Sequence, residues 1–158
     1  MNNFNQVHKK VRLCDVFPEM NEILEGGGSV TLNPKGVSMM PLLRQGRDGV
    51  ILKKTEASPQ KYDIAFYTRP DGQFVLHRIV GKKGDGYVLR GDNQVENEYG
   101  VKESQIIAIV THICRDGKVI SCKSFNYKLY TYFLRPIRQL KIFVAIALKN
   151  KRNKNKKI

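Results

Sequence analysis

Residues 63–80, which read DIAFYTRPDGQFVLHRIV, decide how the centre of this chain folds. They consist of two β-rich runs, 63–68 and 73–80, separated by the tetrapeptide RPDG. Proline and glycine suit a tight reversal, so the segment predicts a β-hairpin. His77 is then expected on a strand antiparallel to residues 63–68.

The flanking sequence repeats this alternation of short β-rich runs and turns. Further runs lie at 29–33, 49–54, 87–90 and 106–114, and the tetrapeptide RDGK at 115–118 forms a second expected turn before Val119 and Ile120. Many short strands with turn residues between them are typical of an all-β domain. We therefore predict a mainly β fold of short, strongly curved antiparallel sheets.

Helical segments are expected at both ends of the β region. Apolar residues recur at helical spacing over 13–24, and the pattern stops at the glycine run 26–28. After residue 123 the chain is rich in Tyr, Leu and Arg, which predicts one or two helical pieces broken near Pro136 and then a disordered basic tip. The expected organisation is an N-terminal helix and Gly-rich linker over 1–28, a β domain over 29–122 and a basic amphipathic segment over 123–158.

The net charge of +14 is concentrated in the C-terminal segment. From Gly117 onward there are 12 Lys and Arg and no Asp or Glu, whereas residues 1–116 carry 16 basic and 14 acidic groups. The N-terminus does not read as a secretory signal, and the longest apolar run, residues 142–148, is too short to cross a bilayer. We expect a cytoplasmic protein that can attach peripherally to the inner membrane face. Its three cysteines fit a reducing compartment, because their number is odd and no Cys-x-x-Cys spacing occurs.

A candidate nucleophile lies in the hexapeptide GVSMMP at residues 36–41. Ser38 occupies a small polar turn there, where a hydroxyl can stand beside backbone N–H groups. By itself the hexapeptide favours a serine that merely caps the turn into residues 39–43.

The order of motifs after Ser38 resembles that of type I signal peptidases. These motifs are GRDGV at 46–50, YDIAF at 62–66, LHRIV at 76–80 and RGDN at 90–93. The resemblance spans residues 36–110 and implies a catalytic β domain with a serine nucleophile. Eubacterial members and self-cleaving repressors carry a lysine base about 40 residues after the serine, whereas the endoplasmic-reticulum and archaeal type carries a histidine. Since His77 follows Ser38 by 39 residues, the resemblance implies a Ser38/His77 pair.

The implied chemistry is hydrolysis of a peptide bond through an acyl-enzyme on Ser38. Imidazole can act as general base without the desolvation that a lysine needs. We expect a separation of about 2.6–3.2 Å, or slightly more without substrate, between the Ser38 hydroxyl and a His77 ring nitrogen. A third group usually orients the imidazole, and the resemblance leaves two candidates open, Asp92 and Glu98.

Residues around Ser38 are expected to bind the substrate. Many signal peptidases have a hydroxyl residue two places before the nucleophile, where this chain has Gly36. The oxyanion is therefore assigned to backbone N–H groups, those of Gly36 and Ser38. Met39, Met40 and Pro41 are expected to line a groove for an extended peptide.

Alternative functions remain open at this stage. A self-cleaving repressor is disfavoured, because only 37 residues precede Ser38 and the chain has no Ala-Gly dipeptide. A non-catalytic peptide-binding protein of the same fold is a second alternative. A third is attachment of residues 135–158 to an anionic membrane surface, which their apolar run between basic flanks favours over a specific nucleic acid. The expected partner is a leader, signal-like or small precursor peptide, and no metal or organic cofactor is implied.

Overall fold

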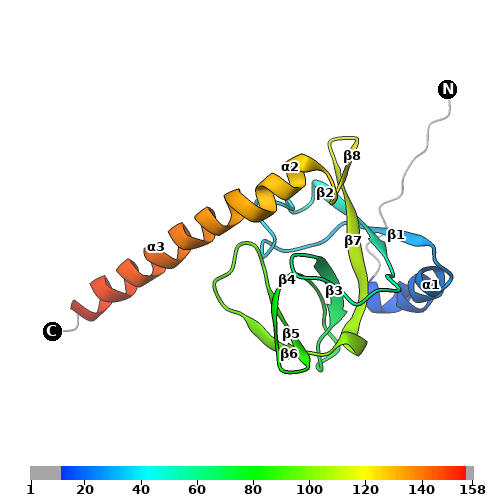
Figure 1. The fold of residues 1–158 in the computed structure, drawn as a ribbon, viewed down its shortest axis with the longest axis horizontal. Helices are drawn as coiled ribbons and strands as arrows, with labels where there is room; N and C mark the ends of the chain where they lie inside the picture. The colour runs from blue at the N-terminus through cyan, green and yellow to red at the C-terminus, as the bar shows by residue number, and fades with distance from the viewer. Residues whose placement is uncertain (1–11, 156–158) are drawn as a thin grey trace.

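Eight antiparallel strands form one curled sheet in the computed structural model, which describes residues 12–155 (Figure 1). The strands are β1 (Ser29–Leu32), β2 (Asp48–Lys53), β3 (Ile64–Thr68), β4 (Phe74–Lys83), β5 (Gly86–Arg90), β6 (Glu98–Val101), β7 (Ile106–Arg115) and β8 (Lys118–Ser121). Their order in the sheet is β1-β2-β7-β3-β4-β5-β6, and β8 pairs with β7. The mainly β, antiparallel architecture is thus confirmed.

Both expected hairpins are present. β3 and β4 pair with Ala65 opposite His77, and the Arg69 amide donates to the Gln73 carbonyl at 2.9 Å across the turn. β7 and β8 are joined by Asp116 and Gly117, which have φ angles of 47° and 74°. Two consecutive residues with positive φ are typical of the tight turns that match strand twist.

The central strands are buried on both faces. In β3, the side chains of Ile64 and Phe66 join one apolar cluster, while Ala65 and Tyr67 join a second cluster on the other face. Alternation of side chains along a strand produces this division. The helix α1 (Leu13–Glu25) covers the first cluster through its buried residues Met20 and Leu24. Residues adjacent in sequence on β3 and β4 therefore face different environments.

The C-terminal segment is a continuous helical run rather than pieces broken near Pro136. It comprises α2 (Phe125–Leu129), the π-helical turn η2 (Tyr130–Leu134) and α3 (Arg135–Asn155). Pro136 is the second residue of α3, directly after the widened turn, where the loss of one N–H donor is tolerated. The basic sequence expected to be disordered is helical to Asn155, and residues 156–158 lie outside the described residues.

Two further elements have no counterpart in the sequence-based prediction: β6 and the 3₁₀ turn η1 (Glu103–Gln105). β6 pairs with β5 through Tyr87 opposite Val101, and Gly86 packs directly on Gly100. Within residues 12–155, no helix combines the length and apolar character that a bilayer span requires.

Candidate active site

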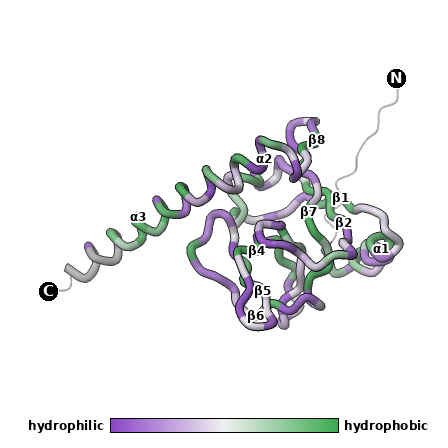
Figure 2. Tube along the Cα trace, in the orientation of Figure 1, coloured by the Kyte–Doolittle hydropathy of each residue, from purple (hydrophilic) through white to green (hydrophobic). Residues whose placement is uncertain are grey.

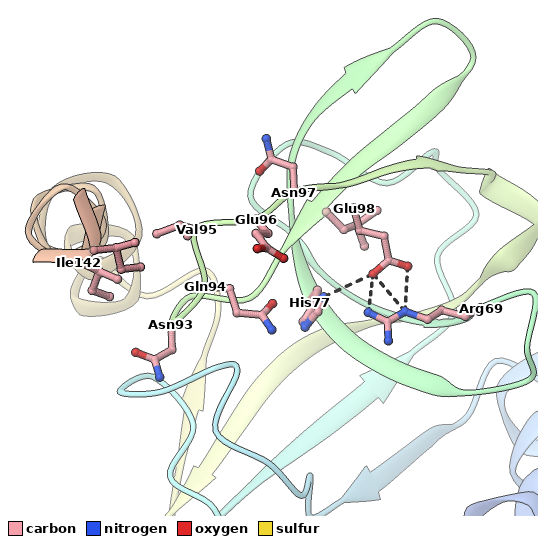
Figure 3. Close-up of a pocket in the computed structure, with 11 residues that line it drawn as sticks. Arg69, His77, Asn93, Gln94, Val95, Glu96, Asn97, Glu98 and Ile142 are labelled. Atoms are coloured by element: carbon pink, nitrogen blue, oxygen red, sulfur yellow. Dashed lines mark hydrogen bonds and ion pairs between the residues drawn. The ribbon is translucent and has the colours of Figure 1, made fainter. Parts of the chain in front are cut away.

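His77 lies in the middle of β4 and is 4% exposed. Its Nδ1 atom is 3.3 Å from Tyr67 Oη and 3.9 Å from Glu98 Oε2. Tyr67 comes from β3 and Glu98 begins β6, so β3, β4 and β6 together supply the group. Figure 3 shows the His77 ring and Glu98 together, with Arg69 on the far side of the carboxylate.

A chain of hydrogen bonds runs from Arg69 through Glu98 and Tyr67 to His77. Arg69 Nη2 donates to Glu98 Oε2 at 2.6 Å, and Tyr67 Oη donates to the same oxygen at 2.7 Å. Hydrogen bonds from Arg69, and then from Tyr67, hold the pKa of Glu98 below its usual range despite partial burial. Burial, reinforced by Glu98, raises the pKa of Tyr67. Near neutral pH the carboxylate is therefore charged and the phenol keeps its proton.

These bonds select one tautomer of His77. A phenol has a single proton, and because Tyr67 gives it to Glu98, its oxygen can only accept from His77 Nδ1. Burial lowers the pKa of His77 to about 4, against the raising effect of the Glu98 charge. The ring is consequently neutral at pH 7, with its proton on Nδ1 and the lone pair of Nε2 available as a base.

Ser38 lies in the loop between β1 and β2, packed against the Gly91-Asp92-Asn93 turn. Its carbonyl accepts a hydrogen bond from the Asn93 amide at 2.7 Å. A Cβ atom added at Gly91 would meet that carbonyl oxygen at 2.6 Å and Ser38 Cβ at 3.0 Å, so only glycine fits there. The motifs around Ser38 and Asp92, far apart in sequence, thus form one contact.

The far end of the Ser38 loop is fixed by a buried carboxylate, Asp48, at the start of β2. Arg44 Nη2 and Arg115 Nη2 each donate to Asp48 at 2.8 Å. Although burial opposes ionisation, these two arginines hold the pKa of Asp48 well below its usual range. Arg115 also donates to the carbonyl of Leu42. The motif GRDGV at 46–50 therefore anchors the loop that carries Ser38.

Asp92 and Glu98, the two candidates for orienting His77, lie in different places. Asp92 forms a two-point ion pair with Arg78, at 2.8 and 2.7 Å, in which both side chains are 0% exposed. His77 and Arg78 are consecutive on a strand and point to opposite faces. Asp92 accordingly faces away from the imidazole, and Glu98 is the acid beside it.

The expected hydrogen bond between Ser38 and His77 is not formed. Among the residues that the structure describes, no bond joins the two side chains, and they line separate hollows of about 120 Å³ and 580 Å³. Asn93, whose amide binds the Ser38 carbonyl, lies in the wall of the His77 hollow. Ser38 and His77 thus approach the same turn from two sides.

The groove residues expected from sequence are only partly found in the hollow beside Ser38. Met39 and Gly36 line it, whereas Met40 and Pro41 do not, and Pro41 is exposed on the turn. Gly36 has a φ of +98°, a conformation that disfavours a side chain. This backbone explains why a glycine occupies the position.

A groove runs from Ser38 along β4 toward α1. The Ser38 hollow and a neighbouring one of about 400 Å³ have walls in common, namely Pro34, Lys35 and residues 74–76. β4 pairs with β5 only from Arg78 onward. Over 74–77, therefore, this edge of β4 has no strand partner in the described part of the chain.

Tyr67 and Arg69 are the site residues that sequence reasoning missed. Their signal is the hairpin itself: its register puts Tyr67 on the same face as His77, diagonally across the strand pair. In the described range 12–155, no group of three His, Cys, Asp or Glu is placed to hold a metal ion. Comparison with protein-family models, curated proteins and solved structures finds no match for this chain.

Proposed function

We propose that this chain is a serine endopeptidase of the type I signal peptidase kind, with Ser38 as nucleophile and His77 as general base. The observation that carries the proposal is the environment of His77, which favours its action as a base. Its ring is neutral, its Nδ1 is engaged by Tyr67, and it lines an open hollow. A general base needs a fixed tautomer, which a third group provides by binding the other ring nitrogen.

In the proposed reaction, Ser38 Oγ attacks the scissile carbonyl while His77 Nε2 takes the hydroxyl proton. The proton then passes to the departing amine, which leaves an acyl-enzyme on Ser38. Water, deprotonated by the same nitrogen, attacks the acyl group and regenerates the serine. The Glu98 charge stabilises the transient imidazolium through Tyr67. Contacts between nucleophile and base often tighten only in the substrate complex, which fits the absence of this bond in the free protein.

The proposed substrate is a leader, signal-like or small precursor peptide bound in extended form. The unpaired edge of β4 over 74–77 and the loop at 34–38 form the two sides of the groove. Main-chain hydrogen bonds along such an edge would hold a peptide regardless of its sequence. The Ser38 amide, next to the open position at Gly36, is the proposed oxyanion donor.

The test is mass-spectrometric profiling of a peptide library with the wild-type protein and the Ser38→Ala and His77→Ala variants. His112→Ala and Ser104→Ala serve as matched controls, because both residues lie outside the two hollows. We expect cleavage at defined sites by the wild type and the controls, and a loss of about 10³-fold or more in kcat/KM for the two site variants.

Cleavage that survives Ser38→Ala would contradict the proposal. Specific peptide binding without cleavage, unchanged in Ser38→Ala, would favour the peptide-binding alternative. The absence of a Ser38–His77 bond among the described residues is the observation that makes this outcome worth measuring.

A further inference from the structure

Helix α3 carries a row of exposed apolar side chains along its length. Figure 1 shows the helix extending away from the sheet, and Figure 2 shows apolar residues where it leaves the body. The exposed members of the row are Ile137, Leu140, Phe143, Val144 and Leu148. Their spacings of three, four, seven and eight residues place them on one face of the helix, called here the apolar stripe. A stripe this exposed is unusual unless another surface covers it.

The rest of α3 shows that the stripe does not belong to the body of the protein. Ile142 and Ile146 line the His77 hollow, and Ile142 lies beside Val95 (Figure 3). On helical spacing, these two residues face nearly opposite the middle of the stripe. Ile142 is half-buried and Ile146 is 40% exposed. This side of the helix therefore faces the hollow, and the stripe faces away from it.

Basic residues follow one flank of the stripe. Arg138, Lys141, Lys149 and Arg152 are exposed there, and the sequence from Gly117 onward contains no acidic residue. The remainder of the chain, residues 1–116, is nearly neutral. An apolar face with a cationic flank matches the headgroup region of an anionic bilayer, where an amphipathic helix lies flat.

The base of α3 is bonded to the turn that packs on Ser38. Gln139 accepts from Arg90 Nη2 at 2.7 Å, and Arg138 Nη2 donates to Asn93 at 3.3 Å. Asn93 in turn donates its amide to the Ser38 carbonyl at 2.7 Å. These bonds connect α3 to the candidate active site, so a surface that binds α3 would also orient the site.

We propose that α3 docks on an anionic phospholipid surface, with its apolar stripe at the boundary between headgroups and acyl chains. The basic flank then contacts the phosphates, and the His77 hollow opens on the opposite side of the helix. This inference rests on α3 alone and is independent of peptidase activity. It goes beyond the proposed function by giving the site a fixed position relative to a membrane surface.

The test is flotation of the full chain with phosphatidylcholine vesicles, with and without phosphatidylglycerol. Phe143→Glu places a charge in the stripe, and Val119→Glu on β8 is its matched control, because both side chains are 61% exposed. We expect the wild type and Val119→Glu to float with the anionic vesicles and Phe143→Glu to bind about tenfold or more weakly. Circular dichroism verifies that both variants keep their fold.

A second pair of variants tests the cationic flank. Lys141→Ala and Lys149→Ala should each weaken binding by about fivefold at low salt, whereas Lys118→Ala should leave it unchanged. Equal flotation of Phe143→Glu and wild type, or no binding to anionic vesicles, would overturn the proposal. A lipid-free dimer that Phe143→Glu dissociates would also overturn it, because a second copy would then cover the stripe.

Discussion

At the scale of single residues, the burial of His77 as a neutral base links folding to pH. Its pKa is about 4 in the folded chain, below the ordinary value of about 6.5 that it regains on unfolding. Between those values the unfolded chain binds more protons than the folded chain. Stability contributed by the neutral ring is therefore complete above about pH 6.5 and is lost as pH falls toward 4.

We expect His77 to account for about 3 kcal/mol of the free energy of unfolding lost between about pH 7 and pH 4. Urea unfolding of wild type and His77→Gln across this range measures the contribution. His112→Gln serves as the control, because the side chain of this half-buried histidine bonds to the neighbouring Thr111. An identical pH dependence in wild type and His77→Gln would show that the imidazole is not held neutral by burial.

The hydroxyl of Tyr67 should matter for turnover more than for substrate binding. Tyr67→Phe removes the acceptor of His77 Nδ1 and leaves the ring without a selected tautomer. If Ser38 and His77 form the catalytic pair as proposed, kcat should fall on the order of tenfold to a hundredfold with little change in KM. Tyr87→Phe is the matched control, since Tyr87 is equally buried and its hydroxyl donates to Glu103 at 2.9 Å. Equal effects of the two substitutions would indicate a purely structural role for Tyr67.

At the scale of secondary-structure elements, the ion pair of Arg78 and Asp92 joins the sheet to the C-terminal helices. Arg78 Nη1 donates to Tyr127 Oη of α2 at 2.9 Å, and Tyr130 Oη of η2 donates to Asp92 at 3.3 Å. Arg78 also binds the carbonyl of Tyr62, which precedes β3. One buried pair thus connects β4, the segment before β3, the turn beside Ser38, α2 and η2.

Asp92→Ala should lower the free energy of unfolding by about 3–5 kcal/mol, because it leaves the buried guanidinium of Arg78 uncompensated. The exposed pair of Arg12 and Asp15, whose side chains are 80% and 45% exposed, provides the contrast. Asp15→Ala should change stability by less than about 1 kcal/mol. Urea titration at neutral pH measures both variants, and similar losses would contradict a dominant role of the buried pair.

Local signals explain which elements could be predicted from sequence. The hairpin at 63–80 was predictable because its apolar runs and its turn residues lie within one short segment. β6 was not, because Glu98–Val101 contains a glycine and owes its conformation to β5, a non-local partner. The helical run continues across Pro136 because a π-helical turn precedes it. No residue type in the sequence predicts such a turn.

Sequence motifs indicated part of the candidate site, whereas the hydrogen bonds between its residues could not be predicted. Motif order pointed to Ser38 and His77, and spacing left Asp92 and Glu98 as alternatives. The two acids can be told apart only in the structure. Asp92 pairs with Arg78 on one face of β4, and Glu98 lies near His77 on the other. The hairpin register places Tyr67 on the face of His77. Its bond to Glu98 depends on tertiary packing, which the sequence does not show.

At the scale of the whole molecule, the outer part of α3 should contribute little to the stability of the body. Beyond Ile146, the described side chains of Ala147, Leu148 and Lys149 are exposed. Removing residues 147–158 deletes six basic residues and lowers the net charge from +14 to +8. We expect this truncation to change the free energy of unfolding by less than about 0.5 kcal/mol, as measured by urea titration.

Truncation from residue 125 onward should instead prevent stable folding. It removes buried Tyr127 and Thr131 together with the partners of Arg78 and Asp92. If both truncated proteins unfold at the same urea concentration as wild type, α2 and η2 contribute nothing to the stability of the body.

Because His77 and Arg78 are neighbours on β4, the length of the turn between β3 and β4 is constrained. A single residue inserted into the turn at 69–72 would shift β4 by one position unless the turn absorbed it as a bulge. The shift would send the guanidinium toward Tyr67 and Glu98 and the imidazole toward Asp92. Asp92 would then lose its guanidinium partner, and the imidazole would leave Tyr67 and Glu98. This hairpin should therefore tolerate substitutions at its tip far better than insertions or deletions.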